Sequence, residues 1–391
     1  MSAEPAGRGR LFAPGPVEVA PAVLEAMARP VLHHRSPEFE RLLLEVRRRL
    51  AEVFMVPGDD VLLLTGSGTA AFEAALLACV PAGGELLSLV SGRFGERWSQ
   101  LARRYGFAVS ELTTAPGTEF DKEALTRALE GLPRLAAVSI VHSETSTGML
   151  HDVAALAAAI KRVRPRALVI TDAVTSLAAA ELRPREWGLD AVVSGSQKGV
   201  MTPPGLSFAW LSEAAWANDS GLLPTGYLDL RRERAKQRGG QTAWTPATSL
   251  VAGLAVALEI IVAQGLERRW REKAALNAAL LAAGSALDLT PLASRPSPAL
   301  AALLTPEDVS APAVVAAMRR AGVYIAGGEG ELKERLLRPS LLGWAGRLDL
   351  LLLSDALEAA LRSVGATPAH GVAAAAAAAN YDAAMAGDLA E

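Results

Sequence analysis

The sequence predicts an α/β fold, with a large domain built on a mainly parallel seven-stranded sheet and a smaller C-terminal α/β domain. Seven short apolar runs alternate with helical patterns, and most linkers are long enough for crossover helices. Unbroken apolar runs of this length are typical of strands that helices cover on both faces. The runs are Val61–Leu64, Leu86–Val90, Ala108–Leu112, Ala136–Val141, Leu168–Thr171, Ala191–Ser194 and Leu206–Leu211.

Local composition and one long apolar helix divide the chain into four parts. Prolines and glycines between Ala13 and Pro16 favour an extended arm, because no helix survives that spacing. A long apolar helix from Leu250 to Gln264 is expected to connect the two domains. Alanine is unbroken from Ala373 to Ala379, and without an apolar stripe to dock we expect a disordered tail. The parts are the arm, residues 1–20; the large domain, 21–264; the small domain, 265–365; and the tail, 366–391.

Further helices are predicted from the 3.6-residue spacing of apolar side chains. In the large domain they span Pro21–Met27, with proline in the first turn, and Phe39–Phe54. In the small domain they lie near Glu272–Ala283, Ala313–Ala321 and Asp349–Leu361. The small domain is therefore expected to be rich in helix.

The composition is that of an ordinary globular enzyme, with 51% hydrophobic and 21% charged residues. A net charge of −3 gives no indication of a nucleic-acid or anionic-membrane partner. Met1–Arg10 lacks the apolar core of a signal peptide, and the apolar span Leu250–Val262 contains Glu259 and is too short to cross a bilayer. We therefore expect a cytoplasmic protein. The single cysteine, Cys79, excludes an intrachain disulfide and is predicted to be a small buried side chain.

The stretch from Ser194 to Gly199 carries a lysine at the mouth of a predicted strand. Lys198 follows the run Ala191–Ser194, and Asp172 follows the run Leu168–Thr171. A buried lysine is costly unless it is paired or used covalently. A lysine and an acid at neighbouring strand ends suit pyridoxal phosphate (PLP), whose aldehyde a lysine holds as a Schiff base and whose ring nitrogen an acid pairs with. The alternative is a solvated loop lysine and a helix-capping aspartate.

A glycine-rich turn, Gly66-Ser67-Gly68-Thr69, lies between the first predicted strand and a helix. Free backbone N–H groups at a helix start form an anion site. The spacing also fits a dinucleotide fingerprint, which requires an acid at the end of the next strand. Glu85 stands at the beginning of that strand instead, so a single phosphate held by Ser67, Gly68 and Thr69 is the better interpretation.

Three side chains that follow other predicted strands are further candidates. Phe94 could stack on a pyridine face, although a lone phenylalanine is more often part of a core. Thr145 could donate a hydrogen bond to the phenolic oxygen of the cofactor. His142 fits a ligand-binding role and a satisfied buried histidine equally well. No metal site is predicted.

An ordered set of motifs resembles the class V aminotransferases, and within them the alanine–glyoxylate and serine–pyruvate (serine–glyoxylate) group. The resemblance runs from about Leu11 to about Gly365 and leaves only the tail uncovered. It implies the PLP-dependent transferase fold type I, a homodimer with shared active sites, and amino-acid and 2-oxo-acid substrates. The motifs are Pro14-Gly15-Pro16, Gly66-Ser67-Gly68, Glu144-Thr145-Ser146-Thr147-Gly148, Thr171-Asp172-Ala173-Val174-Thr175-Ser176, Ser194-Gly195-Ser196-Gln197-Lys198 and Leu337-Arg338-Pro339-Ser340-Leu341-Leu342-Gly343.

The resemblance also assigns roles to individual residues. It makes Lys198 the Schiff-base lysine and Asp172 the partner of the ring nitrogen. It makes Arg338 the residue that binds the substrate carboxylate, with the Gly15 backbone beside it. The remaining cofactor ligands it implies are Ser67, Gly68, Thr69 and Gln197 at the phosphate, Phe94 at the ring face, Thr145 at the ring oxygen, and Gln241 and Thr245 at the phosphate of the other subunit.

The implied activity is transamination of alanine or serine with glyoxylate or pyruvate by a ping-pong mechanism. Arg338-Pro339-Ser340 departs from the arginine-isoleucine-glycine that is commoner in the family, and Gln241 stands where tyrosine is frequent. Rival interpretations are a lyase of the cysteine-desulfurase kind, an NAD-binding dehydrogenase and a catalytically silent scaffold. The first needs a nucleophilic cysteine in the C-terminal half, and Cys79 is in the wrong place.

Overall fold

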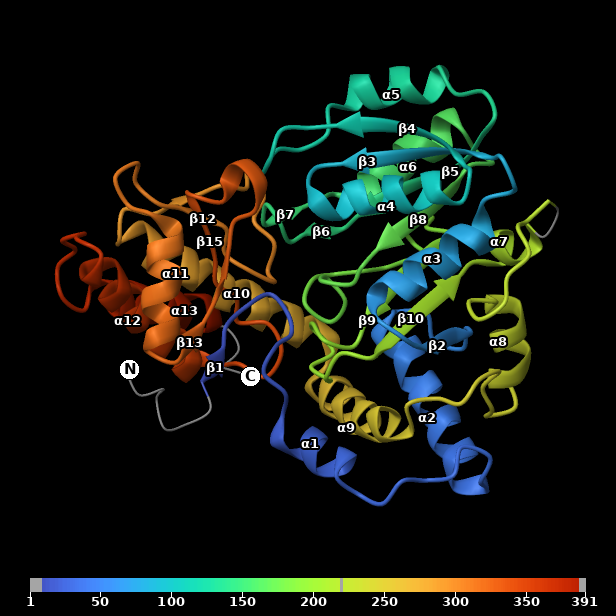
Figure 1. Ribbon diagram of the computed structural model, residues 1–391, viewed down its shortest axis with the longest axis horizontal. Helices are drawn as coiled ribbons and strands as arrows, with labels where there is room; N and C mark the ends of the chain where they lie inside the picture. The colour runs from blue at the N-terminus through green and yellow to red at the C-terminus, as the bar shows by residue number, and fades with distance from the viewer. Residues whose placement is uncertain (1–8, 219–220, 387–391) are drawn as a thin grey trace.

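A computed structural model describes residues 9–218 and 221–386 of the chain. Figure 1 shows two lobes, a larger one around the central sheet and a smaller one that holds the C-terminal helices. Helix α9 (Thr248–Gln264) lies under the sheet, and α10 (Leu266–Ser285) continues from it into the smaller lobe. The long apolar helix that the sequence predicts from Leu250 to Gln264 is thus present as α9.

All seven predicted strands form one sheet, in the order β2-β10-β9-β8-β5-β3-β4. Only β10 runs antiparallel to its neighbours, so the other six strands end at the same edge. The mainly parallel sheet is confirmed, and with it the site edge that such a sheet provides. The strands are β2 (Val61–Thr65), β3 (Glu85–Val90), β4 (Ala108–Thr113), β5 (Leu135–Val141), β8 (Leu168–Asp172), β9 (Ala191–Gly195) and β10 (Leu206–Leu211).

Helices cover both faces of this sheet, which explains why its strands are apolar without alternation. Successive strand residues point to opposite faces. Leu63 packs into the core shared with α2 (Pro37–Val53) and α9, whereas Leu62 and Leu64 pack into the core of α3 (Gly68–Cys79). The other helices of this domain are α1 (Pro21–Met27), α4 (Arg93–Arg104), α5 (Lys122–Glu130), α6 (Val153–Val163), α7 (Glu213–Ala217) and α8 (Leu230–Gln237).

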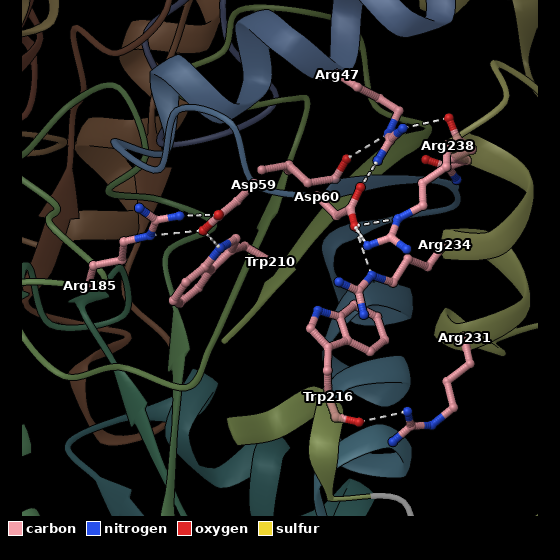
Figure 2. Close-up of polar contacts among 11 residues, drawn as sticks. Arg47, Asp59, Asp60, Arg185, Trp210, Trp216, Arg231, Arg234 and Arg238 are labelled. Atoms are coloured by element: carbon pink, nitrogen blue, oxygen red, sulfur yellow. Dashed lines mark hydrogen bonds and ion pairs between the residues drawn. The ribbon is translucent and has the colours of Figure 1, made fainter. Parts of the chain in front are cut away.

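The amino end of β2 is fixed by a cluster of charged side chains (Figure 2). Asp60 accepts hydrogen bonds from Arg47 at 2.7 Å, from Arg234 at 2.8 Å and from Arg238 at 2.9 Å. Burial alone would raise the pKa of Asp60, but these three hydrogen bonds outweigh it and lower the pKa to about 2. One carboxylate thus ties α2 and α8 to the sheet at the edge opposite the predicted site.

The smaller lobe has a short four-stranded sheet packed against its helices. The N-terminal arm joins this lobe, because β1 (Arg10–Leu11) pairs in parallel with β13 (Val323–Tyr324) and Phe12 is buried in the small core. The sequence predicts an extended arm but not this pairing. The remaining elements are β11 (Thr290–Pro291), β12 (Leu303–Leu304), α11 (Ala311–Arg320), β14 (Ala326–Gly327), the 3₁₀ turn η1 (Gly330–Leu332), β15 (Leu336–Arg338) and α12 (Arg347–Ser363), with the hairpin of β6 (Ser143–Glu144) and β7 (Met149–Leu150) beside the large sheet.

The expected disorder of the alanine-rich tail is wrong for the described residues. Helix α13 (Val372–Met385) packs on α10 and α12, with Ala373 and Ala377 fully buried. The buried Glu358 of α12 accepts the backbone N–H groups of Gly371 and Ala373 at the start of this helix. Small side chains let two helices approach closely, so docking needs no stripe of large apolar residues. The last five residues of the tail, 387–391, lie outside the described part.

Over residues 9–218 and 221–386, no single helix is both long enough and apolar enough to cross a bilayer. Helices α9 and α10 meet the length and composition criteria only as a pair, and they meet at a bend of 89°.

Candidate active site

The predicted site residues gather where β2, β8 and β9 end. Asp172 is the last residue of β8, and it lies in register with Val193 of β9. A Cβ placed on Gly68 would lie 2.7 Å from Val174 Cγ2, and one on Gly195 would lie 3.4 Å from the Gly68 Cα. The turn before α3 is therefore packed against the residues that follow Asp172 and precede Lys198. The N-terminus of α3 points its free N–H groups at this place.

The N-terminal arm completes the pocket by lying against Lys198. A Cβ on Gly15 would stand 2.6 Å from Lys198 Cε and 2.8 Å from its Nζ, and the φ of Gly15 is +149°. Only glycine fits this contact. Burial, helped by the charges of Arg338 and Arg97 and opposed by those of Asp172 and Glu144, lowers the pKa of Lys198 to about 8. An amine with this pKa is partly neutral near pH 8 and can act as a nucleophile or a base.

Asp172 is 4% exposed and accepts the Val174 N–H at 2.8 Å. Burial, helped by the charge of Glu144 and opposed by the Val174 N–H and Lys198, raises its pKa to about 8. The carboxyl group is therefore costly to ionise without a cation beside it. A protonated ring nitrogen is a cation of the required kind.

Two buried polar atoms at the pocket have no hydrogen-bond partner among the described residues: Thr145 Oγ1 and Gln197 Oε1. Buried polar atoms are nearly always paired, so unpaired ones mark places for a ligand. Both belong to residues predicted to bind PLP. Together with the N-terminus of α3, Lys198 and Asp172, they fit the phosphate, ring substituents and aldehyde of this cofactor.

Glu144 holds the start of α4, a role that the sequence does not reveal. Its side chain is fully buried and accepts the N–H groups of Phe94 and Gly95 at 3.0 and 3.2 Å. It also accepts the N–H and the hydroxyl of Ser146, at 3.0 and 2.6 Å. Burial raises the pKa of Glu144, and these four donors oppose the rise. The carboxylate thereby fixes Phe94 at the mouth of β3.

Arg97 is a second residue that sequence reasoning missed. Its Cζ lies 4.8 Å from the centroid of the Phe94 ring, and its Nη1 donates to Thr69 Oγ1 at 3.5 Å. It therefore joins the predicted stacking residue to the predicted phosphate turn. The available signal was its position, three residues after Phe94 on the same face of α4.

Arg338 reaches the pocket from the end of β15 in the smaller lobe. It is 7% exposed, and its Nη1 donates to the Thr145 carbonyl oxygen at 2.9 Å. Its Nε donates to the Gly327 carbonyl oxygen at 2.7 Å, and its Nη2 donates to Glu329 at 3.1 Å. Burial lowers the pKa of Arg338, while Glu144 opposes that effect and Arg93 adds to it. A guanidinium is thus held beside the residue predicted to face the ring oxygen.

Two residues, Gln241 and Thr245, are expected to serve the phosphate of the other subunit. Gln241 Nε2 donates to Glu40 Oε1 at 2.8 Å, and Thr245 is exposed. Of the undecided residues, His142 is buried with its ring edge against Trp187, and burial lowers its pKa to about 3. Cys79 is buried as predicted, and burial raises its pKa to about 12.

Comparison with known proteins identifies the family of the chain. The sequence model of the family described as aminotransferase class-V matches residues 19–332. A protein of Synechococcus sp. named soluble hydrogenase, small subunit, is 37% identical, covering 94% of this chain and 97% of that one. The serine–glyoxylate aminotransferase of Hyphomicrobium methylovorum is 31% identical over 90% of this chain and 88% of its own.

A solved structure titled as the aspartate aminotransferase of subgroup IV from Thermus thermophilus is 41% identical, with a TM-score of 0.85. The match covers 91% of this chain and 99% of that one. Fold, pocket and relatives therefore point to one conclusion: the chain belongs to the class V aminotransferases and is a PLP-dependent transaminase.

Proposed function

We propose that this transaminase moves the amino group of a small amino acid, alanine or serine, to glyoxylate or pyruvate by a ping-pong mechanism. The observation that carries the proposal is the position of Lys198, which lies against Gly15 and within range of the charges of Asp172 and Arg338. Every substrate of this reaction carries a carboxylate, which the Arg338 guanidinium can bind at two points. The similarity to a serine–glyoxylate aminotransferase supports these substrates.

PLP, when bound, supplies the conjugated ring that takes up the electron pair left by the broken Cα–H bond. Ser67, Gly68 and Thr69 would hold its phosphate at the start of α3, and the Phe94 ring would lie against its face. Asp172 would keep the proton on the ring nitrogen. Lys198 Nζ would then move the proton away from the substrate Cα and later return one, as a general base and acid.

Aspartate is a second candidate amino donor. The similar structure from Thermus thermophilus is titled as an aspartate aminotransferase. In this chain a second guanidinium, that of Arg93, lies near Arg338, since both pair with Glu329, and it could receive the extra carboxylate. Alanine and serine carry no second carboxylate for Arg93 to pair with.

A panel of amino donors tests both candidates. Alanine, serine, aspartate and glycine are each incubated with the holoenzyme and glyoxylate or pyruvate, and the new 2-oxo acid is measured. We expect turnover with alanine or serine at the lowest KM. Aspartate at a lower KM would replace the first candidate by the second, and no turnover with any donor would refute transamination of small amino acids.

We further propose a homodimer in which Gln241 and Thr245 serve the phosphate of the partner subunit. The exposed Thr245 supports this, because a phosphate ligand that serves its own chain would be expected inside the pocket. The cytoplasmic location expected from the sequence stays a prediction, which fractionation of the native cell would check.

Complementation tests the shared site. Thr245→Glu sets a carboxylate against the phosphate, and Lys198→Ala removes the lysine, so each homodimer is inactive. After the two chains are unfolded and refolded together, about a quarter of all sites in random dimers should recover if each site combines Lys198 and Thr245 from different chains. No recovery, with heterodimers shown to form, would contradict the shared site.

A further inference from the structure

Arg338 divides its donors between the backbone and one side chain. Its Nε and Nη1 donate to the carbonyl oxygens of Gly327 and Thr145, at 2.7 and 2.9 Å. Its Nη2 donates to Glu329 Oε1 at 3.1 Å. Nη2 is thus the terminal nitrogen that holds no backbone carbonyl, and a carboxylate is already bound there.

Glu329 reaches this position from the loop between β14 and β15. It stands between Gly328 and Gly330, and its side chain is 42% exposed. Its other oxygen, Oε2, pairs with Arg93, the first residue of α4, whose side chain is 55% exposed. A single carboxylate therefore bridges an arginine of the small domain and an arginine of the large domain.

The group that Glu329 presents to Arg338 is the group that every amino-acid or 2-oxo-acid substrate must present. A two-point contact with a substrate carboxylate needs a terminal nitrogen, and two negative charges on that nitrogen repel each other. We propose that Glu329 is a built-in occupant of the substrate-carboxylate site, which substrate must displace from Arg338 before it can react. This inference rests on the proposed function, in which Arg338 binds that carboxylate.

Displacing Glu329 from Arg338 costs little free energy, because its carboxylate keeps a second partner. Glu329 lies at the surface, glycines flank it, and Arg93 can keep its carboxylate after Arg338 is released. The guanidinium of this pair is buried but its carboxylate is 42% exposed, and an ion pair that water reaches on one side has a modest net strength. The competition is therefore expected to weaken the binding of all substrate carboxylates about fivefold, as an ion pair of about 1 kcal/mol would.

The substitution Glu329→Gln tests this, because glutamine keeps the shape and loses the charge. We expect KM for the amino donor and for the 2-oxo acid to fall together, each about fivefold. Glu331→Gln is the matched control, since Glu331 is an exposed acid two residues along in the same turn. Its KM values should stay within about 1.5-fold of the wild type.

Acetate provides a readout that does not depend on turnover. Calorimetric titration of the wild-type holoenzyme and both variants with acetate should give a Kd about fivefold lower for Glu329→Gln alone. Loss of acetate binding in Arg338→Met would show that acetate binds at Arg338. If wild-type enzyme bound acetate but transaminated nothing, the proposed function would fail while the inference about Glu329 could still be judged.

A positioning role for Glu329 predicts changes of the opposite sign in KM and in the Kd of acetate. If Glu329 holds Arg338 in position for the substrate, Glu329→Gln raises KM and the Kd of acetate. A rise, or no change, in these two quantities overturns the proposal. Circular dichroism of each variant confirms that the exposed loop tolerates the substitution.

Discussion

Asp172→Asn should stabilise the cofactor-free protein while it inactivates the enzyme. Asparagine has the same shape, and its side-chain oxygen can still accept the Val174 N–H that Asp172 accepts at 2.8 Å. What it removes is a buried carboxyl group whose pKa burial raises from 3.8 to about 8. The effect of the substitution should therefore depend on pH.

The size and sign of that effect follow from proton binding. Between the unfolded pKa of 3.8 and the folded pKa of about 8, the folded state keeps a proton that the unfolded chain releases, so stability falls as pH rises. At about 1.36 kcal/mol for each pKa unit, the wild type would lose up to about 5 kcal/mol by pH 8. Because water can enter a cofactor-free pocket, we expect about half of this, roughly 2–3 kcal/mol.

Urea unfolding of the cofactor-free proteins, at one protein concentration and several pH values from 5 to 8, measures the difference. Asp172→Asn should already exceed the wild type by about 1 kcal/mol at pH 5, and the difference should grow to roughly 2–3 kcal/mol at pH 8. Asp121→Asn, at an exposed helix N-cap where asparagine serves equally well, is the control and should change the free energy of unfolding by less than about 0.5 kcal/mol. A variant less stable than wild type at every pH would refute the reasoning. In the holoenzyme the same substitution should lower kcat about 100-fold or more, since the ring nitrogen loses its anion.

Three further outcomes are expected. Lys198→Ala should retain PLP noncovalently, seen by equilibrium dialysis, and lose at least about 100-fold in kcat; a smaller loss would mean that another group moves the proton. Arg338→Lys should raise KM for both substrates about tenfold with little change in PLP affinity, because lysine lacks the planar fork; an unchanged KM would place the carboxylate elsewhere. Ala377→Asp should lower the free energy of unfolding by about 2 kcal/mol or more, whereas Ala375→Asp, on the exposed side of α13, should cost less than about 0.5 kcal/mol; equal effects would contradict the docking of this helix.

The sheet and the core of the site could be predicted because both depend on local patterns. Each strand is a compact apolar run, and in the structure each lies within about one residue of its predicted limits. Parallel strands bring their carboxyl ends to one edge, so Asp172 and Lys198 had to meet once the sheet was correct. The cofactor followed from the chemistry of that pair.

The contacts that complete the pocket could not be predicted, because tertiary packing creates them. Glu144 and Arg97 are charged residues like many others in the sequence, and only the fold buries one and lays the other over Phe94. The contact of Glu329 with Arg338 depends on how a glycine-flanked loop turns back. Helix α13 was missed because alanine gives no apolar pattern, although small side chains suit close helix packing.

Helix α10 explains how two lobes keep the reactive lysine and the carboxylate-binding arginine in register. Arg269 of this helix donates to the Gly199 carbonyl oxygen at 2.9 Å, next to Lys198. One turn further, Lys273 donates to the carbonyl oxygens of the loop after Arg338, at 2.9, 3.1 and 3.0 Å. Burial lowers the pKa of Lys273 to about 7, and the charge of Arg269 adds to this, so both cations are costly to bury. Carbonyl oxygens and the charge of Glu272 together stabilise the two neighbouring cations, and the carbonyl oxygens would lose their partners if either side chain were shortened. Through these hydrogen bonds, Arg269 and Lys273 hold the segment next to Lys198 and the loop after Arg338 on the same helix. They therefore help to fix the separation of Lys198 and Arg338, which a substrate must span between its Cα and its carboxylate.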